Sequence, residues 1–156
     1  MAQPSHNAMY FEDFEVGDLF RHSRGKTMTE MDHILMCNLV MNTASAHFDE
    51  AIMADHMFKT RVVYGGITIS MVLGLAAQDT AENAIAELSM DNIRLRHPVF
   101  HNDTLYAFTR VEGIEDGERD DAGIVSFHHW GMNQDDKIVF EGDRRTLIKR
   151  RSHWGS

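Results

Sequence analysis

The chain has a single cysteine among its 156 residues, only two prolines and no apolar run long enough to cross a membrane. Because Cys37 has no second cysteine as a partner, an internal disulfide is excluded, which fits a reducing compartment. A membrane-spanning helix needs about 18 consecutive apolar residues, so none is expected. The opening MAQPSHNAM is short and polar, unlike a signal peptide. We therefore expect a cytoplasmic protein.

Basic residues are scarce as well. The chain carries 15 Lys and Arg against 24 Asp and Glu, a net charge of −9, which argues against a nucleic-acid partner. The charge is uneven, because IEDGERDDAG is acidic whereas the C-terminal RRTLIKRR is basic. A local basic strip on an acidic protein suits a small phosphorylated ligand better than a polyanion.

Two familiar kinds of catalytic site have no signature in this chain. There is no G-x-S-x-G nucleophile elbow, which argues against a serine hydrolase. HFDE and the pair Asp55-His56 contain side chains that can bind metals, but their spacing matches no known metal site. We therefore expect no bound metal.

The length suits one domain with a substantial core, and no internal repeat is visible. We interpret residues 1–9 as a flexible tail and residues 10–156 as a single domain. GDLFRHSRGKTMT indicates a first strand. Thr29 is a good helix N-cap followed by acidic residues, so a helix is expected from there to about Asn42, with NTASAH as a loop.

The most apolar stretch of the chain is RVVYGGITISMVLGLAAQDT. Residues 67–77 are apolar on nearly every side, which is typical of a buried helix. A fully buried strand is the alternative, but this run is long for one. The hydrophobic period then changes to two, as Ile93 and Leu95 alternate with arginines, and three more such segments follow. One strand, a central helix and about four antiparallel strands predict an α+β fold.

Five motifs, taken in order, resemble the MaoC-like (R)-specific enoyl-CoA hydratase/dehydratase family: YFEDFEVGD, RGKTMTEMD, NTASAHFDE, VVYGGITISMVLGL and IRLRHPVFHNDTLY. The resemblance covers Tyr10 to about Trp154. It implies the hot-dog fold, a long antiparallel sheet wrapped around one central buried helix. GGITIS, NQDDKIVFEG and the Asn42-Thr43 pair are most similar to hydratases of branched C5 dicarboxylyl-CoA esters such as mesaconyl-CoA or itaconyl-CoA.

The resemblance implies a lyase that reversibly hydrates an α,β-unsaturated acyl-CoA thioester. Coenzyme A enters as part of the substrate, and no separate cofactor is expected. The expected partners are this thioester and a second copy of the chain, in at least a homodimer with the site at the interface, and no nucleic acid or membrane. An acyl-CoA thioesterase shares the fold, but such enzymes usually place an acidic residue near the helix start, and YGGITIS has none. A non-catalytic acyl-CoA binding protein is the other alternative.

The resemblance also implies residue roles. The family's catalytic histidine falls on His47, and its frequent catalytic aspartate falls on Asn42, which cannot titrate. The backbone oxyanion donors at the helix start fall on Gly65 and Gly66, and the helix serine falls on Ser70. We expect His47 to move the protons and Asn42 to orient the attacking water. The purely structural alternatives are a solvated His47, glycines that only open a helix, and a Ser70 bonded to the carbonyl four residues earlier.

The substrate would also need cations. A dicarboxylyl chain has a free carboxylate, which is very costly to bury unpaired and is matched best by a guanidinium. Arg61 is our first candidate because it lies four residues before Gly65, and Arg24 and Lys26 come next, although all three are otherwise surface charges. The candidates for the phosphates of coenzyme A are Arg94, Arg96, Lys149, Arg150 and Arg151.

Overall fold

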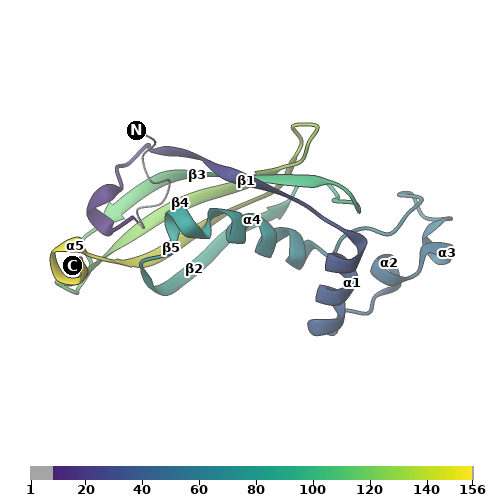
Figure 1. Cartoon of the computed structure of the whole chain (residues 1–156), viewed down its shortest axis with the longest axis horizontal. Helices are drawn as coiled ribbons and strands as arrows, with labels where there is room; N and C mark the ends of the chain where they lie inside the picture. The colour runs from purple at the N-terminus through teal and green to yellow at the C-terminus, as the bar shows by residue number, and fades with distance from the viewer. Residues whose placement is uncertain (1–8, 156) are drawn as a thin grey trace.

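The computed structural model describes residues 9–155, so the tail expected at residues 1–9 lies outside it except for Met9. Met9 is held in place, because its carbonyl accepts a hydrogen bond from Asn83 Nδ2 at 3.1 Å. The molecule is elongated, with one sheet and a long helix lying across one face of it (Figure 1). Within the described residues, no helix is both long enough and apolar enough to cross a membrane.

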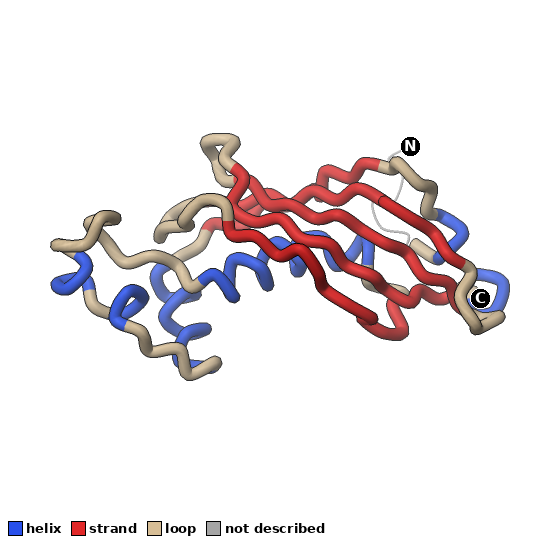
Figure 2. The backbone as a smooth tube through the Cα atoms, turned by 180° about the vertical axis from the view of Figure 1, so that it is seen from behind, coloured by secondary structure: helices blue, strands red, loops and turns tan. Residues whose placement is uncertain are grey.

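The sheet has five strands in the order β1-β3-β4-β5-β2, and every neighbouring pair is antiparallel. Figure 2 shows the strands running side by side with the helix behind them. This arrangement confirms the α+β prediction of one strand before the central helix and four after it. The strands are β1 (Leu19–Thr27), β2 (Ala84–Leu95), β3 (Thr104–Glu115), β4 (Ala122–Met132) and β5 (Ile138–Lys149).

The edge strand β2 begins well before Ile93, where the alternating pattern first becomes visible in the sequence. Its pairing with β5 shifts register three times, between Ala84 and Ala86, between Glu87 and Ser89, and between Asp91 and Arg94. Each irregularity interrupts the strict alternation of side chains. The first part of β2 therefore has no clean period of two in its sequence.

The long helix is α4 (Gly65–Thr80), which confirms the helical interpretation of the apolar stretch over the strand alternative. Ile67, Val72 and Ala76 are buried against the sheet. The helix is not buried on every side, however, because Ser70 and Gly74 are exposed. Residues four apart share one helix face, so these small residues form an open stripe opposite the core. The side of the helix that is left uncovered in the single chain therefore carries small residues, while the larger apolar side chains around it are at least partly buried.

Helix α1 (Glu30–Leu39) begins as expected, since Thr29 accepts a hydrogen bond from the Asp32 N–H in a capping box. It ends earlier than about Asn42, because Met41 takes a positive φ of 58°. The segment expected to be a loop contains two short helices, α2 (Ser45–Phe48) and α3 (Glu50–Met53). Helices α1 to α3 gather at one end of the molecule, and η1 (Phe11–Asp13) and α5 (Arg151–Trp154) lie at the other (Figure 1).

Candidate active site

His47 lies on α2 and is half-buried. Its Nδ1 atom is 2.8 Å from the carbonyl oxygen of Val62. A carbonyl oxygen can only accept, so Nδ1 carries the proton, and Nε2 of the neutral ring keeps its lone pair. The local structure therefore sets the tautomer in which Nε2 can take a proton from a bound molecule.

His47 lines a cavity of about 330 Å³ together with Gly65 and Thr68 from α4. The opposite wall comes from β2 and the segment after it, including Leu95 and Arg96. The cavity thus brings together the predicted catalytic histidine and the first residue of the central helix. Its remaining lining residues are Phe58, Val62, Val63, His97, Pro98 and Val99.

Gly65 and Gly66 are the first two residues of α4. The carbonyl of Tyr64, the N-cap, accepts hydrogen bonds from the N–H groups of Ile67 and Thr68 at 2.9 and 3.3 Å. The first N–H groups of a helix have no partner inside it and carry positive potential. A Cβ atom at Gly65 would overlap Leu95 Cδ1, so a larger residue at this position would require the Leu95 side chain to move.

Asn42 holds the turn that leads into α2. Its Oδ1 atom accepts the N–H of Ala44 at 3.3 Å, and its own N–H donates to the Cys37 carbonyl at 3.0 Å. The side-chain NH2 remains available as a donor. Asn42 does not line the cavity that His47 lines, so its role in orienting water stays a prediction.

Two histidines beside His47 were given no role from the sequence. His33 is fully buried, its ring centroid is 5.7 Å from that of His47, and its Nδ1 lies 2.7 Å from His101 Nε2. Burial, together with the nearby His101, His47 and Arg61, lowers the pKa of His33 to about 4. Burial also lowers the pKa of His101. No sequence motif connects His33 and His101 with His47. The sequence offered only a large number of histidines, which does not show which of them lie together.

The structure places Arg61 in a cluster of ion pairs. Its Nε donates to Glu50 Oε2 at 2.7 Å, its Nη2 contacts Glu30, and only 15% of its side chain is exposed. The hydrogen bond from Arg61 lowers the pKa of Glu50 to about 2. Both carboxylates are therefore ionised near neutral pH, and Arg61 links α1 to α3. Binding of a substrate carboxylate by Arg61 stays a prediction, one that requires replacing a carboxylate already bound.

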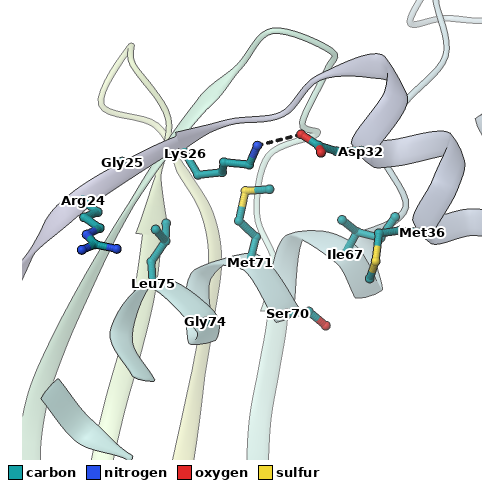
Figure 3. A pocket seen from close by; sticks show the side chains of 10 residues that line it. All are labelled: Arg24, Gly25, Lys26, Asp32, Met36, Ile67, Ser70, Met71, Gly74 and Leu75. Atoms are coloured by element: carbon teal, nitrogen blue, oxygen red, sulfur yellow. Dashed lines mark hydrogen bonds and ion pairs between the residues drawn. The ribbon is translucent and has the colours of Figure 1, made fainter. Parts of the chain in front are cut away.

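Ser70 does not line the cavity of His47. Its Oγ donates to the Gly66 carbonyl at 2.9 Å, as the structural alternative for this serine expects. Ser70 lines a second cavity, of about 460 Å³, between α4 and β1, which also includes Arg24 and Lys26 (Figure 3). Lys26 Nζ donates to Asp32 Oδ2 at 2.8 Å across this cavity.

The candidate phosphate ligands divide into two groups. Arg96 lines the cavity of His47 directly after β2, where its Nε donates to Glu141 at 2.8 Å, and Arg94 is exposed near the end of β2. Lys149 and Arg150 lie where β5 leads into α5, at the opposite end of the molecule from α2 (Figure 1). The single chain therefore brings Arg96, but neither Lys149 nor Arg150, to the cavity of His47.

Comparison with known proteins decides the family. A family model described as mesaconyl-CoA hydratase matches residues 5–150. The chain belongs to the mesaconyl-CoA hydratase family. A mesaconyl-CoA hydratase of Haloarcula marismortui is 34% identical over 152 residues, which cover 90% of this chain and 42% of that protein.

Solved structures of this family's fold agree with the observed architecture. The crystal structure of a putative MaoC domain protein dehydratase from Chloroflexus aurantiacus has a TM-score of 0.86 and 26% identity over 93% of this chain and 46% of that one. A Mycobacterium tuberculosis protein described as a double hotdog fold has a TM-score of 0.85 and 19% identity over 96% of this chain and 46% of that one. The hot-dog fold and the MaoC-like resemblance are confirmed. The chain spans less than half the length of the three proteins compared here.

Proposed function

We propose that this chain reversibly hydrates an α,β-unsaturated acyl-CoA thioester. The observation that carries the proposal is one cavity shared by His47, whose Nε2 is left as a base by the Val62 carbonyl, and Gly65 at the start of α4. The names of the mesaconyl-CoA hydratase relative and of the MaoC domain dehydratase support the same reaction. Hydration needs a proton acceptor and an oxyanion site within reach of one substrate.

The reaction uses these groups in two steps. The thioester oxygen accepts hydrogen bonds from the N–H groups of Gly65 and Gly66, which makes Cβ of the enoyl group electrophilic. His47 Nε2 takes a proton from water as the water oxygen bonds to Cβ, and the electrons of the double bond move onto the thioester. The imidazolium then returns its Nε2 proton to Cα, so one water is added and His47 regains its starting form. Asn42 is proposed to hold the attacking water.

Mesaconyl-CoA is the proposed substrate, and its free carboxylate needs a cation. Arg96 is already at the cavity wall and is paired with one carboxylate, Glu141, whereas Arg61 is bound by both Glu30 and Glu50. Arg96 therefore joins Arg61 as a candidate for the anionic groups of the substrate. Arg94 would contact the phosphates of coenzyme A from the end of β2, and Lys149 and Arg150 would have to act from the far end of the sheet.

We propose that the active form is a homodimer in the cytoplasm. Strand β2 is an edge of the sheet, and four of its apolar side chains are between 45% and 55% exposed. Exposed apolar edges are covered in stable proteins, often by another strand. The compared proteins are more than twice as long, and one of them is described as a double hotdog fold, which a pair of these chains would imitate. The four side chains are Leu88, Met90, Ile93 and Leu95.

Mass spectrometry of purified protein incubated with mesaconyl-CoA tests the proposed reaction. Hydration adds the mass of one water to the thioester, whereas a thioesterase releases free coenzyme A. Crotonyl-CoA serves as the matched substrate without the second carboxylate. Free coenzyme A without hydrated product would establish the thioesterase alternative, and tight binding without turnover would establish an acyl-CoA binding protein.

A further inference from the structure

We propose that His33 is a positioning residue that fixes the oxyanion end of α4 relative to His47. The inference rests on the proposed function, because it assigns His33 to the same site. His33 lies on α1 and is fully buried, and its Nε2 is 3.1 Å from the backbone nitrogen of Tyr64. Tyr64 is the N-cap of α4 and directly precedes the two glycines. His33 thus fixes Tyr64, the residue directly before the proposed oxyanion donors Gly65 and Gly66.

The hydrogen bonds determine where the protons of His33 lie. The backbone N–H of Tyr64 is a donor, so Nε2 of His33 must be unprotonated and accept. Nδ1 then carries the proton and donates to His101 Nε2, which is 2.7 Å away. Both ring nitrogens of the buried His33 are satisfied by this one arrangement, and His101 keeps its own proton on Nδ1. The pair connects the start of α4 to the segment between β2 and β3.

His33 also contacts His47, the residue proposed to move the protons. Its ring meets that of His47 edge to face, with 5.7 Å between the centroids and 85° between the planes, and the centroid of the Tyr64 ring lies 5.6 Å from that of His47. A change in the His33 ring therefore alters both the position of Tyr64 and the packing of His47. Misplacement by about 1 Å can reduce turnover about 100-fold even where binding contacts remain.

The charges around His33 keep it in the accepting form. It faces His47 and His101, with Arg61 close by and the carboxylate of Glu30 opposing them. Burial is the largest cause of the lowered pKa of His33, near 4, followed by the nearby His101 and His47 and then by Arg61. If His33 were protonated, Nε2 would carry an N–H that faces the N–H of Tyr64. Two donors cannot bond to each other, so the hydrogen bond to Tyr64 would be lost.

Three substitutions at this position test the proposal. His33→Gln can present its amide oxygen where Nε2 was and keep the bond from Tyr64. His33→Asn reaches only the position of Nδ1, so it can contact His101 but not Tyr64, and His33→Leu can contact neither. We expect His33→Gln to keep kcat within about threefold, and His33→Asn and His33→Leu to lower kcat by about 10- to 100-fold with KM changed less than threefold.

Amide hydrogen exchange of Tyr64 supplies a measurement that does not depend on activity. The Tyr64 N–H should be protected in the wild type and in His33→Gln, and should exchange faster in His33→Asn. Equal kcat in His33→Gln and His33→Asn would overturn the proposal, as would unchanged Tyr64 exchange in His33→Asn. Nitrogen-15 spectra of the wild type must show His33 protonated at Nδ1, and the opposite tautomer would also refute it. If the wild type hydrates no enoyl-CoA while Tyr64 behaves as expected, the proposed function fails and the anchoring by His33 stands.

Discussion

The Nδ1 atom of His47 lies 2.8 Å from the Val62 carbonyl, and the Val62 N–H donates to the Ala46 carbonyl at 3.1 Å. These two bonds attach α2 to the segment that leads into α4. They orient the imidazole and set its tautomer at the same time, so His47 and the start of α4 form one structural unit.

His47→Ala should lower kcat for hydration by about 100- to 10,000-fold, the usual contribution of a positioned acid/base group. Binding of the thioester should change little, because the proposed role of the ring is to move protons rather than to hold the ligand. Steady-state kinetics and a binding titration with mesaconyl-CoA measure the two effects separately. His153→Ala, at the far end of the molecule, is the control and should behave as wild type. An alanine variant at position 47 that keeps more than about a tenth of kcat would exclude the assigned role.

Asn42→Asp should retain hydration, with an altered pH profile, because a carboxylate also accepts the N–H of Ala44. Asn42→Ala should lower kcat by about tenfold and destabilise the fold by about 1 kcal/mol, since it removes both the turn contact and the proposed partner of water. Kinetics across pH and urea unfolding measure the two effects. Wild-type kinetics for Asn42→Ala at every pH would remove Asn42 from the site.

Arg61→Ala distinguishes a structural role of Arg61, in the ion pairs that link α1 to α3, from the predicted role of binding the substrate carboxylate. Because Glu30 and Glu50 already bind the guanidinium, we expect similar losses of kcat/KM on mesaconyl-CoA and on crotonyl-CoA. A much larger loss on mesaconyl-CoA would support the assignment made from the sequence, in which Arg61 binds the substrate carboxylate. Arg96→Ala is the matched variant from the cavity wall and should impair mesaconyl-CoA more than crotonyl-CoA if Arg96 binds that carboxylate.

The free energy of unfolding should rise with pH between about 4 and 6.5, because two fully buried histidines are neutral in the folded state. Burial lowers the pKa of His129 to about 3 and that of His33 to about 4. Both pKa values are depressed, so the unfolded chain binds these protons first as the pH falls below about 6.5. Each histidine contributes a slope of up to about 1.4 kcal/mol per pH unit. Urea unfolding from pH 4.5 to 7.5 measures this slope, and His33→Gln should reduce it.

Met90→Arg should convert the proposed dimer into monomers. A charge on the exposed apolar edge of β2 would have to be buried on association, and charged edge residues prevent strand pairing. Light scattering after size-exclusion chromatography gives the mass directly. Met31→Arg on α1 is the control, since Met31 is also exposed but lies away from β2. A wild-type monomer at micromolar concentration, or an unchanged dimer in Met90→Arg, would contradict this interface.

The sequence by itself determined the features that depend on neighbouring residues. The Thr29 cap, the helix after Tyr64 and the alternation in β3 to β5 are local patterns, and they were predicted correctly. The motif order also identified the family and pointed to His47 as the catalytic candidate. The start of β2 was missed because its bulges remove the alternation on which such a prediction depends.

Only the tertiary structure decided which distant side chains meet. His33 reaches Tyr64 and His101 across 31 and 68 positions of the chain, and Arg61 reaches Glu30 across 31. Such contacts depend on how α1 lies against the start of α4, which no local propensity specifies. The exposed side of α4 also depends on how the elements pack. The sequence shows an apolar helix, but only the folded chain determines which side of it the sheet covers.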